Sequence, residues 1–582
     1  MKTIIYKLIP LCAAAGLLLS SCIQETFSTE YAGASQIGVS EQALEALSNS
    51  TSAFMYAYGY FGTLDSQEFG YPAMMIMRDA LTDCPYVSTN YNHFSTPWAS
   101  LVDFTSGRAR QPWRYYYRMI LNANNTIFAV EDPDNAPEKI QRFYGNALVY
   151  RAMSYMDLAR MYEYKKTGIG ALDAEADRNN VWGLTAVIID EHFDDATADN
   201  NPRAPFYKMY RFIMNDLNRA EKYLTGYSRP NKTRANLSVV HAYKARLWLE
   251  IATRFQKYPE DLATQLAHEN DEDIAMYDKL GISSVNDCYQ KAAQYASSVI
   301  AGYSPLSKDE WHSLTNGFNN ANTNSWVFAV SITSPDAVYS RVNSFQSNNV
   351  TEYSRGYSRS QYHCYRMIDR NLYDRIEDSD WRKVTWIDPA DYSVTPTPSK
   401  YYTLLSDSEW ALRGAYVGFK FRPNEGDTSD DYTNALQTDF PVVRVEEMYF
   451  IEAEAKAYTE GLSSGVNALT SFMNTYRYTD NSYAVSPGSV EDFVDNHLIT
   501  QKRVELWGEG LAYFDIKRRE IALTRGYTDT NWLPSNRYNS LPGYTASWLN
   551  FYVPNEGEAS LNHAIIMNPD PRVADSYTLW TE

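Results

Sequence analysis

Apolar side chains recur at helical spacing in several long stretches of this 582-residue chain. Within residues 145–163, Leu148, Ala152 and Tyr155 begin a series separated by four and three positions, which places them on one side of a helix. Residues 235–255 carry apolar side chains on two sides, as expected for a helix packed between other helices. The same spacing predicts further helices over residues 113–130, 205–224 and 444–458. The pattern therefore predicts a mainly α protein built from stacked helical hairpins.

Two long stretches lack this periodicity. Residues 304–440 are rich in Asn, Ser, Tyr, Pro and Asp, with short β-like runs at residues 326–330 and 416–421, and residues 521–582 have a similar composition. Long irregular segments inside a compact protein usually carry function. We therefore expect a helical scaffold with long irregular loop insertions and a few short strands. The expected divisions are residues 41–303, 304–440, 441–520 and 521–582.

The N-terminus has the features of an export signal. Two lysines precede an apolar run over residues 8–19, which is too short to span a bilayer as a helix. The sequence Leu-Ser-Ser-Cys that ends at Cys22 resembles a bacterial lipobox, in which the cysteine receives lipid. We expect removal of residues 1–21, lipidation of Cys22 and a tether over residues 22–40. The alternative is an ordinary secretory signal in which the cysteine stands by chance.

Composition narrows the class of ligand. The net charge of −19 argues against nucleic acid as a partner. The chain has 48 Tyr against 23 Phe and 13 Trp, and such an excess suggests rings with one solvated edge, as at binding surfaces. Beyond Cys22 the cysteines are Cys84, Cys288 and Cys364, too few for a disulfide scaffold and without the spacing of a zinc site.

The sequence offers no convincing catalytic centre. Residues 461–465 match the G-x-S-x-G nucleophile pattern, but they follow a predicted helix rather than a strand, so we interpret the glycines as a helix C-cap and loop. Glu505 and Glu509 could be paired glycosidase carboxylates, but basic residues at 503 and 517–519 make ion pairing the simpler interpretation. The acidic cluster at 271–273 lacks calcium-loop spacing, and no nucleotide or zinc motif is present. We expect no metal and no cofactor.

Several ordered segments resemble one family. Residues 503–518, RVELWGEGLAYFDIKR, look like the R-x-E-L-x-G-E-G-x-R-x-x-D-L-x-R block of the SusD/RagB family of bacterial surface lipoproteins. Ala512 departs from that block at a position where a basic residue is frequent. Residues 444–455 are similar to the family's R-x-x-E-x-x-x-x-x-A-E-A helix, and residues 151–160 are similar to its R-A-x-x-Y-x-D-L helix. The closing stretch of the family resembles residues 552–556 with 568–569.

This resemblance implies a fold, a location and a function. The fold would consist of tetratricopeptide-like helical hairpins with loop insertions on one side. The protein would be lipid-anchored on the outer face of an outer membrane. There it would cap a SusC-like TonB-dependent transporter and deliver an oligosaccharide or, in some members of the family, a peptide, without catalysis. Two other readings stay open: a surface glycoside hydrolase on the same anchor, and an interaction scaffold without a ligand.

Three loops concentrate residues suited to holding a sugar, whose apolar face stacks on aromatic rings while polar side chains bind its hydroxyls. The preferred group lies in and just before the first loop, residues 84–98: Arg78, Asp83, Tyr86, Asn90, Tyr91 and Trp98. The candidates of the second loop, residues 311–362, are Trp311, Tyr339, Tyr353 and Tyr357. The third loop comprises residues 532–548. We assign Trp113, Trp248 and Trp507 to the core instead, because they lie in predicted helices or family-like blocks.

Overall fold

The computed structural model describes most of the chain beyond residue 39. The described residues are 40–57, 70–82, 84–85, 107–331, 366–394, 398, 400–401, 410, 414–421, 438–554, 558–571 and 577–581. Within these ranges, none of the helices has both the length and the apolar character that a membrane-spanning helix needs. The same ranges hold no group of three or more His, Cys, Asp and Glu side chains placed to bind a metal ion.

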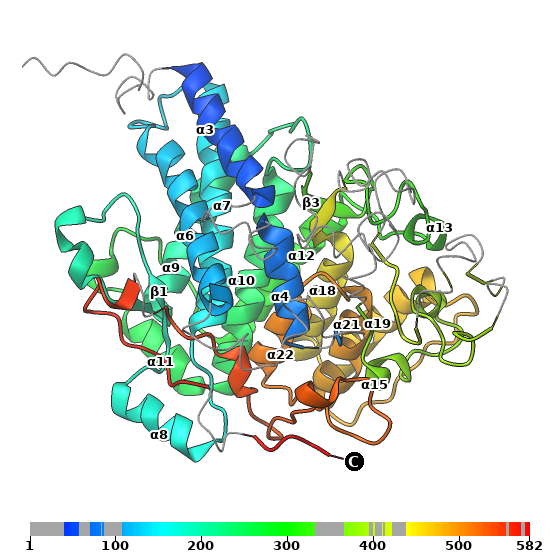
Figure 1. The fold of residues 1–582 in the computed structure, drawn as a ribbon. Helices are drawn as coiled ribbons and strands as arrows, with labels where there is room; N and C mark the ends of the chain where they lie inside the picture. Colours follow the sequence, from blue (N-terminus) through cyan, green and yellow to red (C-terminus); the bar gives the residue numbers. More distant parts are fainter. Residues whose placement is uncertain are drawn as a thin grey trace, which may run out of the picture.

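A continuous series of packed helices forms the scaffold, as Figure 1 shows. Helix α6 (Gly107–Phe128) packs on α7 (Glu138–Tyr162), and α7 packs on α9 (Phe206–Leu224). The series continues through α10 (Leu237–Lys257) to α12 (Val285–Ile300). The last members of the series are α18 (Val445–Thr459) and α19 (Leu462–Tyr476). The prediction of a mainly α protein with stacked helical hairpins is confirmed.

Shorter helices cover the flanks of this series. Helix α3 (Glu41–Ala53) packs on α6 and α7, and α4 (Gly70–Ala80) contacts α22 (Ala512–Arg519). Helix α8 (Gly170–Asn179) precedes the first strand, and α11 (Pro259–Ala267) follows α10. The remaining short helices are α13 (Lys308–Trp311), α15 (Arg370–Tyr373), α20 (Val490–Asp492) and α21 (Ile499–Glu505).

The burial of the long helices matches their apolar pattern. In α10, almost every residue from Val239 to Phe255 is buried, which accounts for the two apolar sides seen in the sequence. In α7, burial extends from Phe143 to Tyr162, interrupted only at Arg160. The tryptophans assigned to the core, Trp113, Trp248 and Trp507, are all buried.

The G-x-S-x-G segment proved to be part of a helix. Gly461 has a φ of 101° and joins α18 to α19. A nucleophile elbow needs a strand before the motif, and here a helix precedes it, so this segment does not form an elbow. The prediction of a loop was wrong from Leu462 onward, because Ser463 and Gly465 lie in α19. A Cβ at Gly465 would stand 2.5 Å from Ala457 Cβ, so this glycine lets α19 approach α18 closely.

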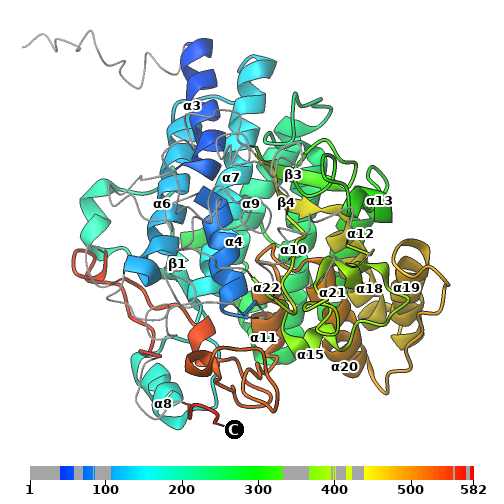
Figure 2. The ribbon, with the colours of Figure 1, turned by 45° about the vertical axis from the view of Figure 1, so that its right-hand side comes forward.

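Two short antiparallel strand pairs accompany the helices. Strand β1 (Leu184–Val187) pairs with β2 (Arg203–Pro205). Strand β3 (Trp326–Val330), which the sequence predicted, pairs with β4 (Phe440–Arg444), as the two neighbouring arrows in Figure 2 show. Residues 416–421 form isolated bridges instead of the predicted strand. Because β3 and β4 pair, Val330 and Phe440 lie side by side although 110 positions separate them in sequence.

Candidate functional site

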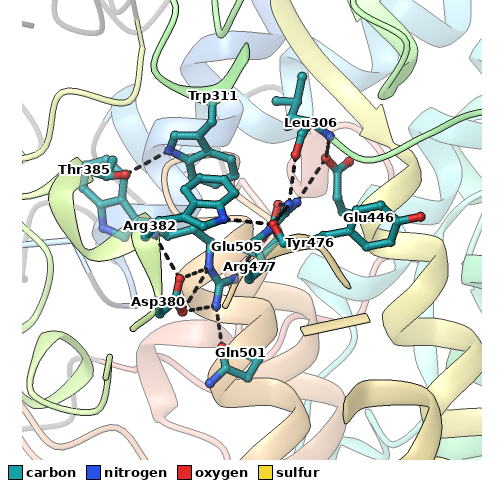
Figure 3. A network of polar contacts seen from close by, with 12 residues as sticks. Leu306, Trp311, Asp380, Arg382, Thr385, Glu446, Tyr476, Arg477, Gln501 and Glu505 are labelled. Carbon is teal, nitrogen blue, oxygen red and sulfur yellow. Dashed lines mark hydrogen bonds and ion pairs between the residues drawn. The ribbon is translucent and has the colours of Figure 1, made fainter. Parts of the chain in front are cut away.

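A buried ion-pair network joins the irregular region to the helices (Figure 3). The Glu505 carboxylate accepts hydrogen bonds from Arg382 at 2.9 Å, Arg444 at 3.1 Å and Arg477 at 2.8 and 2.9 Å. All four side chains are fully buried. Burial would raise the pKa of Glu505, but the charges of the three guanidinium groups outweigh it and hold that pKa well below its usual value.

Glu509 is held in the same network. Arg444 donates to its carboxylate at 2.8 Å, and Lys420 Nζ donates to it at 2.6 Å. Burial lowers the pKa of Lys420 to about 8, although Glu509 opposes that effect. With both carboxylates enclosed by cations, Glu505 and Glu509 do not face a substrate as a glycosidase pair would.

Ion pairing was therefore the right interpretation of these two glutamates, but the expected partners were wrong. The basic residues that follow in sequence bind elsewhere: Lys517 donates to the carbonyl of Met161, Arg518 to Glu454, and Arg519 to Asp495. The actual partners come from positions 382, 420, 444 and 477, far away in sequence. The ion pairs of Glu505 and Glu509 therefore connect segments that are distant in sequence.

Two of the predicted ligand residues lie in the interior instead of at a binding surface. Trp311 is only 1% exposed, and its indole N–H donates to Thr385 Oγ1 at 2.9 Å. Arg78 is 0% exposed and donates to Asp157 at 3.0 Å and to Tyr116 at 2.8 Å. The prediction of ligand contact is wrong for both side chains, because each is enclosed and bonded to protein partners.

The other predicted ligand residues lie outside the described part of the chain, and their role stays a prediction. They are Asp83, Tyr86, Asn90, Tyr91, Trp98, Tyr339, Tyr353 and Tyr357. The segments that precede and follow these undescribed stretches are described, however, so the structure does show where the predicted loops are attached.

The bases of the three loops meet at one place. The Met367 N–H donates to the carbonyl of Pro85 at 2.8 Å, which ties the chain after the second loop to the start of the first. Asn531 Nδ2 donates to the carbonyl of Ile368 at 2.8 Å, which adds the third loop. Trp548, at the end of the third loop, donates its indole N–H to the carbonyl of Leu81 at 3.0 Å.

Asp369 and Arg525 organise this junction. The Asp369 carboxylate accepts from Trp532 Nε1 at 2.6 Å and from the Tyr527 hydroxyl at 2.9 Å. The Arg525 guanidinium lies 4.2 Å from the ring centre of Trp532 and 5.2 Å from that of Trp548, as in cation–π contacts. Both tryptophans are buried, so within the third loop they support the junction rather than offer an open ring.

A small polar hollow, called the basal hollow below, opens between these segments. Its volume is about 200 Å³, and its lining residues are Thr82, Asp369, Asn371, Leu372, Arg375, Arg503 and Ala522 to Arg525. Sites for small molecules usually measure about 300–1,000 Å³, so the basal hollow has room for only part of an oligosaccharide. Its lining combines carboxylate, amide, hydroxyl and guanidinium groups, which can donate to and accept from sugar hydroxyls.

Two profiles of known protein families match the chain. A profile described as "Starch-binding associating with outer membrane", of the SusD-like type, matches residues 73–249, and the profile of the SusD family matches residues 397–555. Together the two profiles match more than half of the chain. The protein belongs to the SusD family.

Solved structures share its fold over nearly the whole length. A SusD-like carbohydrate-binding protein from Bacteroides vulgatus is 19% identical, with a TM-score of 0.64, and the alignment covers 92% of this chain and 99% of that one. A SusD superfamily protein from Bacteroides thetaiotaomicron is 17% identical, with a TM-score of 0.61 and coverage of 91% and 100%. A laminarin-binding SusD-like protein is 16% identical, with a TM-score of 0.55 and coverage of 90% and 97%. No curated protein sequence matches the chain.

In this SusD-family protein the blocks that carried the resemblance are structural. The block at residues 503–518 supplies Glu505 and Glu509 to the buried network, and the helix that begins at residue 445 follows directly on Arg444. The residues that shape the basal hollow, above all Asp369 and Arg525, were missed in the sequence. Neither stands in a recognisable motif, and the only local signal is that Asp369 caps the short helix α15.

Proposed function

We propose that this SusD-family protein is a lipid-anchored protein of the cell surface that binds oligosaccharides without cleaving them. It would deliver them to a SusC-like TonB-dependent transporter. The family profiles support this proposal, since one of them is described as starch-binding and associated with the outer membrane. Two proteins of the same fold are named for carbohydrate and for laminarin binding.

The observation that carries the proposal is the junction of the three loops. Segments that are separated by 163 to 467 positions in sequence are hydrogen-bonded to one another beside the basal hollow. Each continues into a loop rich in Tyr, Trp and Asn. Rings and amides drawn from three loops suit a ligand that alternates apolar faces with hydroxyl edges, as a sugar chain does.

The fate of the two candidate carboxylates supports binding without cleavage. A retaining or inverting glycosidase needs a protonated and an ionised carboxyl group on either side of the bond that it cleaves. Glu505 and Glu509 are instead buried among Arg and Lys side chains, in the network that connects the segments. We therefore expect the bound glycan to leave the protein unaltered.

Substitution of Trp98 tests the ligand site. We expect Trp98→Ala, in soluble protein from residue 23 onward, to weaken binding of starch or laminarin oligosaccharides by about 1–3 kcal/mol, or about 5- to 150-fold, as for a lost stacking ring. Isothermal titration calorimetry measures the affinity, and circular dichroism checks the fold. Phe128→Ala is the matched control, because Phe128 is an aromatic residue 49% exposed at the end of α6.

The same samples decide between the competing functions. Unchanged affinity of Trp98→Ala would remove that residue from the site. New reducing ends after incubation with the polysaccharide would show an enzyme. Binding of peptides but of no glycan would favour the peptide-binding alternative.

A further inference from the structure

A second hollow, separate from the three-loop junction, carries an exposed tryptophan. It measures about 360 Å³ and lies between the loop after α7, helix α8 and the start of α11; we call it the Trp182 hollow. Its lining residues are Glu163 to Lys166, Asp173, Asp177, Trp182, Gly183, Phe206, Arg254, Tyr258, Glu260 and Asp261. Among the tryptophans of the described segments, Trp182 is the one with an exposed side chain, at 38%.

The protein holds this ring at the surface in a fixed orientation. Trp182 Nε1 donates to Asp177 Oδ1 at 2.8 Å, and the ring of Tyr164 meets the indole edge-on with centres 5.3 Å apart. Gly183, with a φ of 71°, turns the chain directly after Trp182, and a Cβ there would stand 2.9 Å from Phe206 Cδ1. Because its edge is bonded to the protein and its rotation is restricted, the indole keeps an apolar surface toward solvent at little further cost in entropy on binding.

Polar groups of both signs surround the ring. Lys166 and Glu260 are exposed at the rim, whereas the deeper Glu163 carboxylate is paired with Arg254 and Lys165. Asp173 accepts hydrogen bonds from the backbone N–H groups of Thr167 and Gly168 and from the Tyr164 hydroxyl. The lining therefore offers donors and acceptors next to an apolar ring, with acids outnumbering bases, which disfavours an anionic ligand.

We propose that the Trp182 hollow binds one or a few sugar residues of a glycan, stacked on the Trp182 indole. The proposal rests on the proposed function for its class of ligand and adds a second, independent contact with the same chain. A larger hollow of about 560 Å³ along α6 is lined mainly by apolar side chains, and its tryptophan, Trp113, is buried.

The two hollows are separate from each other. They share no lining residue. Both views place α8 and α15, which border the Trp182 and basal hollows, at the lower end of the molecule but apart from each other (Figures 1 and 2). A long glycan that contacts both would bind more tightly than a short one, because the second contact becomes intramolecular.

Four forms of the soluble chain from residue 23 test this inference: the wild type, Trp182→Ala, Trp98→Ala and the double variant, with Phe128→Ala as control. The measurement is retardation in native gels containing starch or laminarin. We expect Trp182→Ala to weaken retention by the polysaccharide about tenfold, and the double variant to bind more weakly than either single variant. Short oligosaccharides should lose much less affinity in Trp182→Ala than in Trp98→Ala.

Hydroxyl-radical footprinting tests the Trp182 hollow in the wild type, so its result does not depend on whether an alanine variant folds. In the wild type, hydroxyl-radical oxidation of the peptide that contains Trp182, followed by mass spectrometry, should decrease when the retained polysaccharide is added. Trp182→Phe should keep most of the retention, since it keeps a flat ring.

The outcomes separate the two proposals. Wild-type retention in Trp182→Ala, or unchanged oxidation of Trp182 in the presence of bound glycan, overturns the second site and leaves the proposed function standing. A wild type that neither starch nor laminarin retains, and that binds no oligosaccharide on a glycan array, overturns both.

Discussion

Fully buried charges hold the irregular segments of this protein in place. Glu505 contacts three guanidinium groups, of which Arg382 comes from the irregular region, Arg444 ends β4 and Arg477 follows α19. Such an ion-pair cluster adds little stability compared with an apolar core of the same volume, because desolvation offsets attraction. Removing one charge from it, however, leaves buried charge of the opposite sign without full compensation. The main effect of the cluster is therefore to select which segments come together. Its contribution to the total free energy of unfolding is smaller.

The substitution Glu505→Gln tests how much stability is lost when one charge is removed from this cluster. The substitution keeps the shape of the side chain but leaves three buried cations without their shared anion, so we expect the free energy of unfolding to fall by about 3–5 kcal/mol. Urea denaturation followed by circular dichroism measures it. Glu491→Gln, the same change at an exposed position of α20, should alter stability by less than about 0.5 kcal/mol. A loss below about 1 kcal/mol for Glu505→Gln would contradict the assigned role.

Glu163 should make stability depend on pH in acid. Burial would raise its pKa, but Arg254 and then Lys165 outweigh burial and lower the pKa of Glu163 from 4.5 to about 2. Since the folded-state value is the lower one, this contribution, about 3 kcal/mol, is fully present above pH 4.5 and is lost as the pH falls toward 2.

We expect Glu163→Gln to be less stable than the wild type at pH 6 and the difference between them to shrink as the pH falls from 4.5 to 2. Urea denaturation at a series of pH values measures both proteins. Glu272→Gln, at an exposed position, serves as the control and should show no such convergence. A constant difference over that range would show that the carboxylate does not act through its charge.

At the scale of elements, the sequence predicted helices whose apolar side chains are large. It identified α6, α7, α9, α10, α18 and the strand β3, with ends within a few residues for most of them. It missed α12, whose buried side includes Cys288, Ala292 and Ala296 and gives only a weak apolar signal. It also missed α19, where glycine and serine in the first turns suggested a loop. Small residues mark close helix contacts, and their role becomes visible only when the neighbouring helix is known.

Gly465→Ala tests such a contact. Alanine favours a helix over glycine by about 1 kcal/mol, but its Cβ would stand 2.5 Å from Ala457 Cβ and 2.9 Å from the carbonyl oxygen of Ala453. We expect the clash to outweigh the helical preference and to lower the free energy of unfolding by about 1–3 kcal/mol, measured by urea denaturation. Ser463→Ala, on the exposed side of the same helix, should be neutral or slightly stabilising. A stabilised Gly465→Ala would show that α18 and α19 are less tightly packed.

For the whole molecule, sequence identified the candidate loops better than the individual ligand residues. The loops are visible because their composition differs from that of the helices. Arg78 and Trp311 were misassigned because their burial depends on Asp157 and Thr385, which are 79 and 74 positions away. The junction depends on still longer separations, such as the 163 positions between Asp369 and Trp532. No local pattern carries that information, so only the folded structure shows that the loops have a common base.

The lipid anchor can be tested by substituting Cys22, which lies outside the described residues. We expect Cys22→Ser to be exported but not to remain in the membrane fraction, because each buried lipid CH₂ contributes about 0.8 kcal/mol to anchoring and the variant would carry no lipid. Cell fractionation and the mass of the N-terminal peptide measure the outcome. Cys12→Ser is the matched control: position 12 belongs to the segment predicted to be removed, so this variant should be lipidated and fractionate like the wild type.

The purified Cys22→Ser protein should bind glycan with unchanged affinity, since the binding loops are far from the anchor in sequence. Cells that carry this variant should lose uptake of that glycan. Retention of Cys22→Ser in the membrane fraction with an unmodified N-terminal peptide would contradict lipid anchoring at this residue.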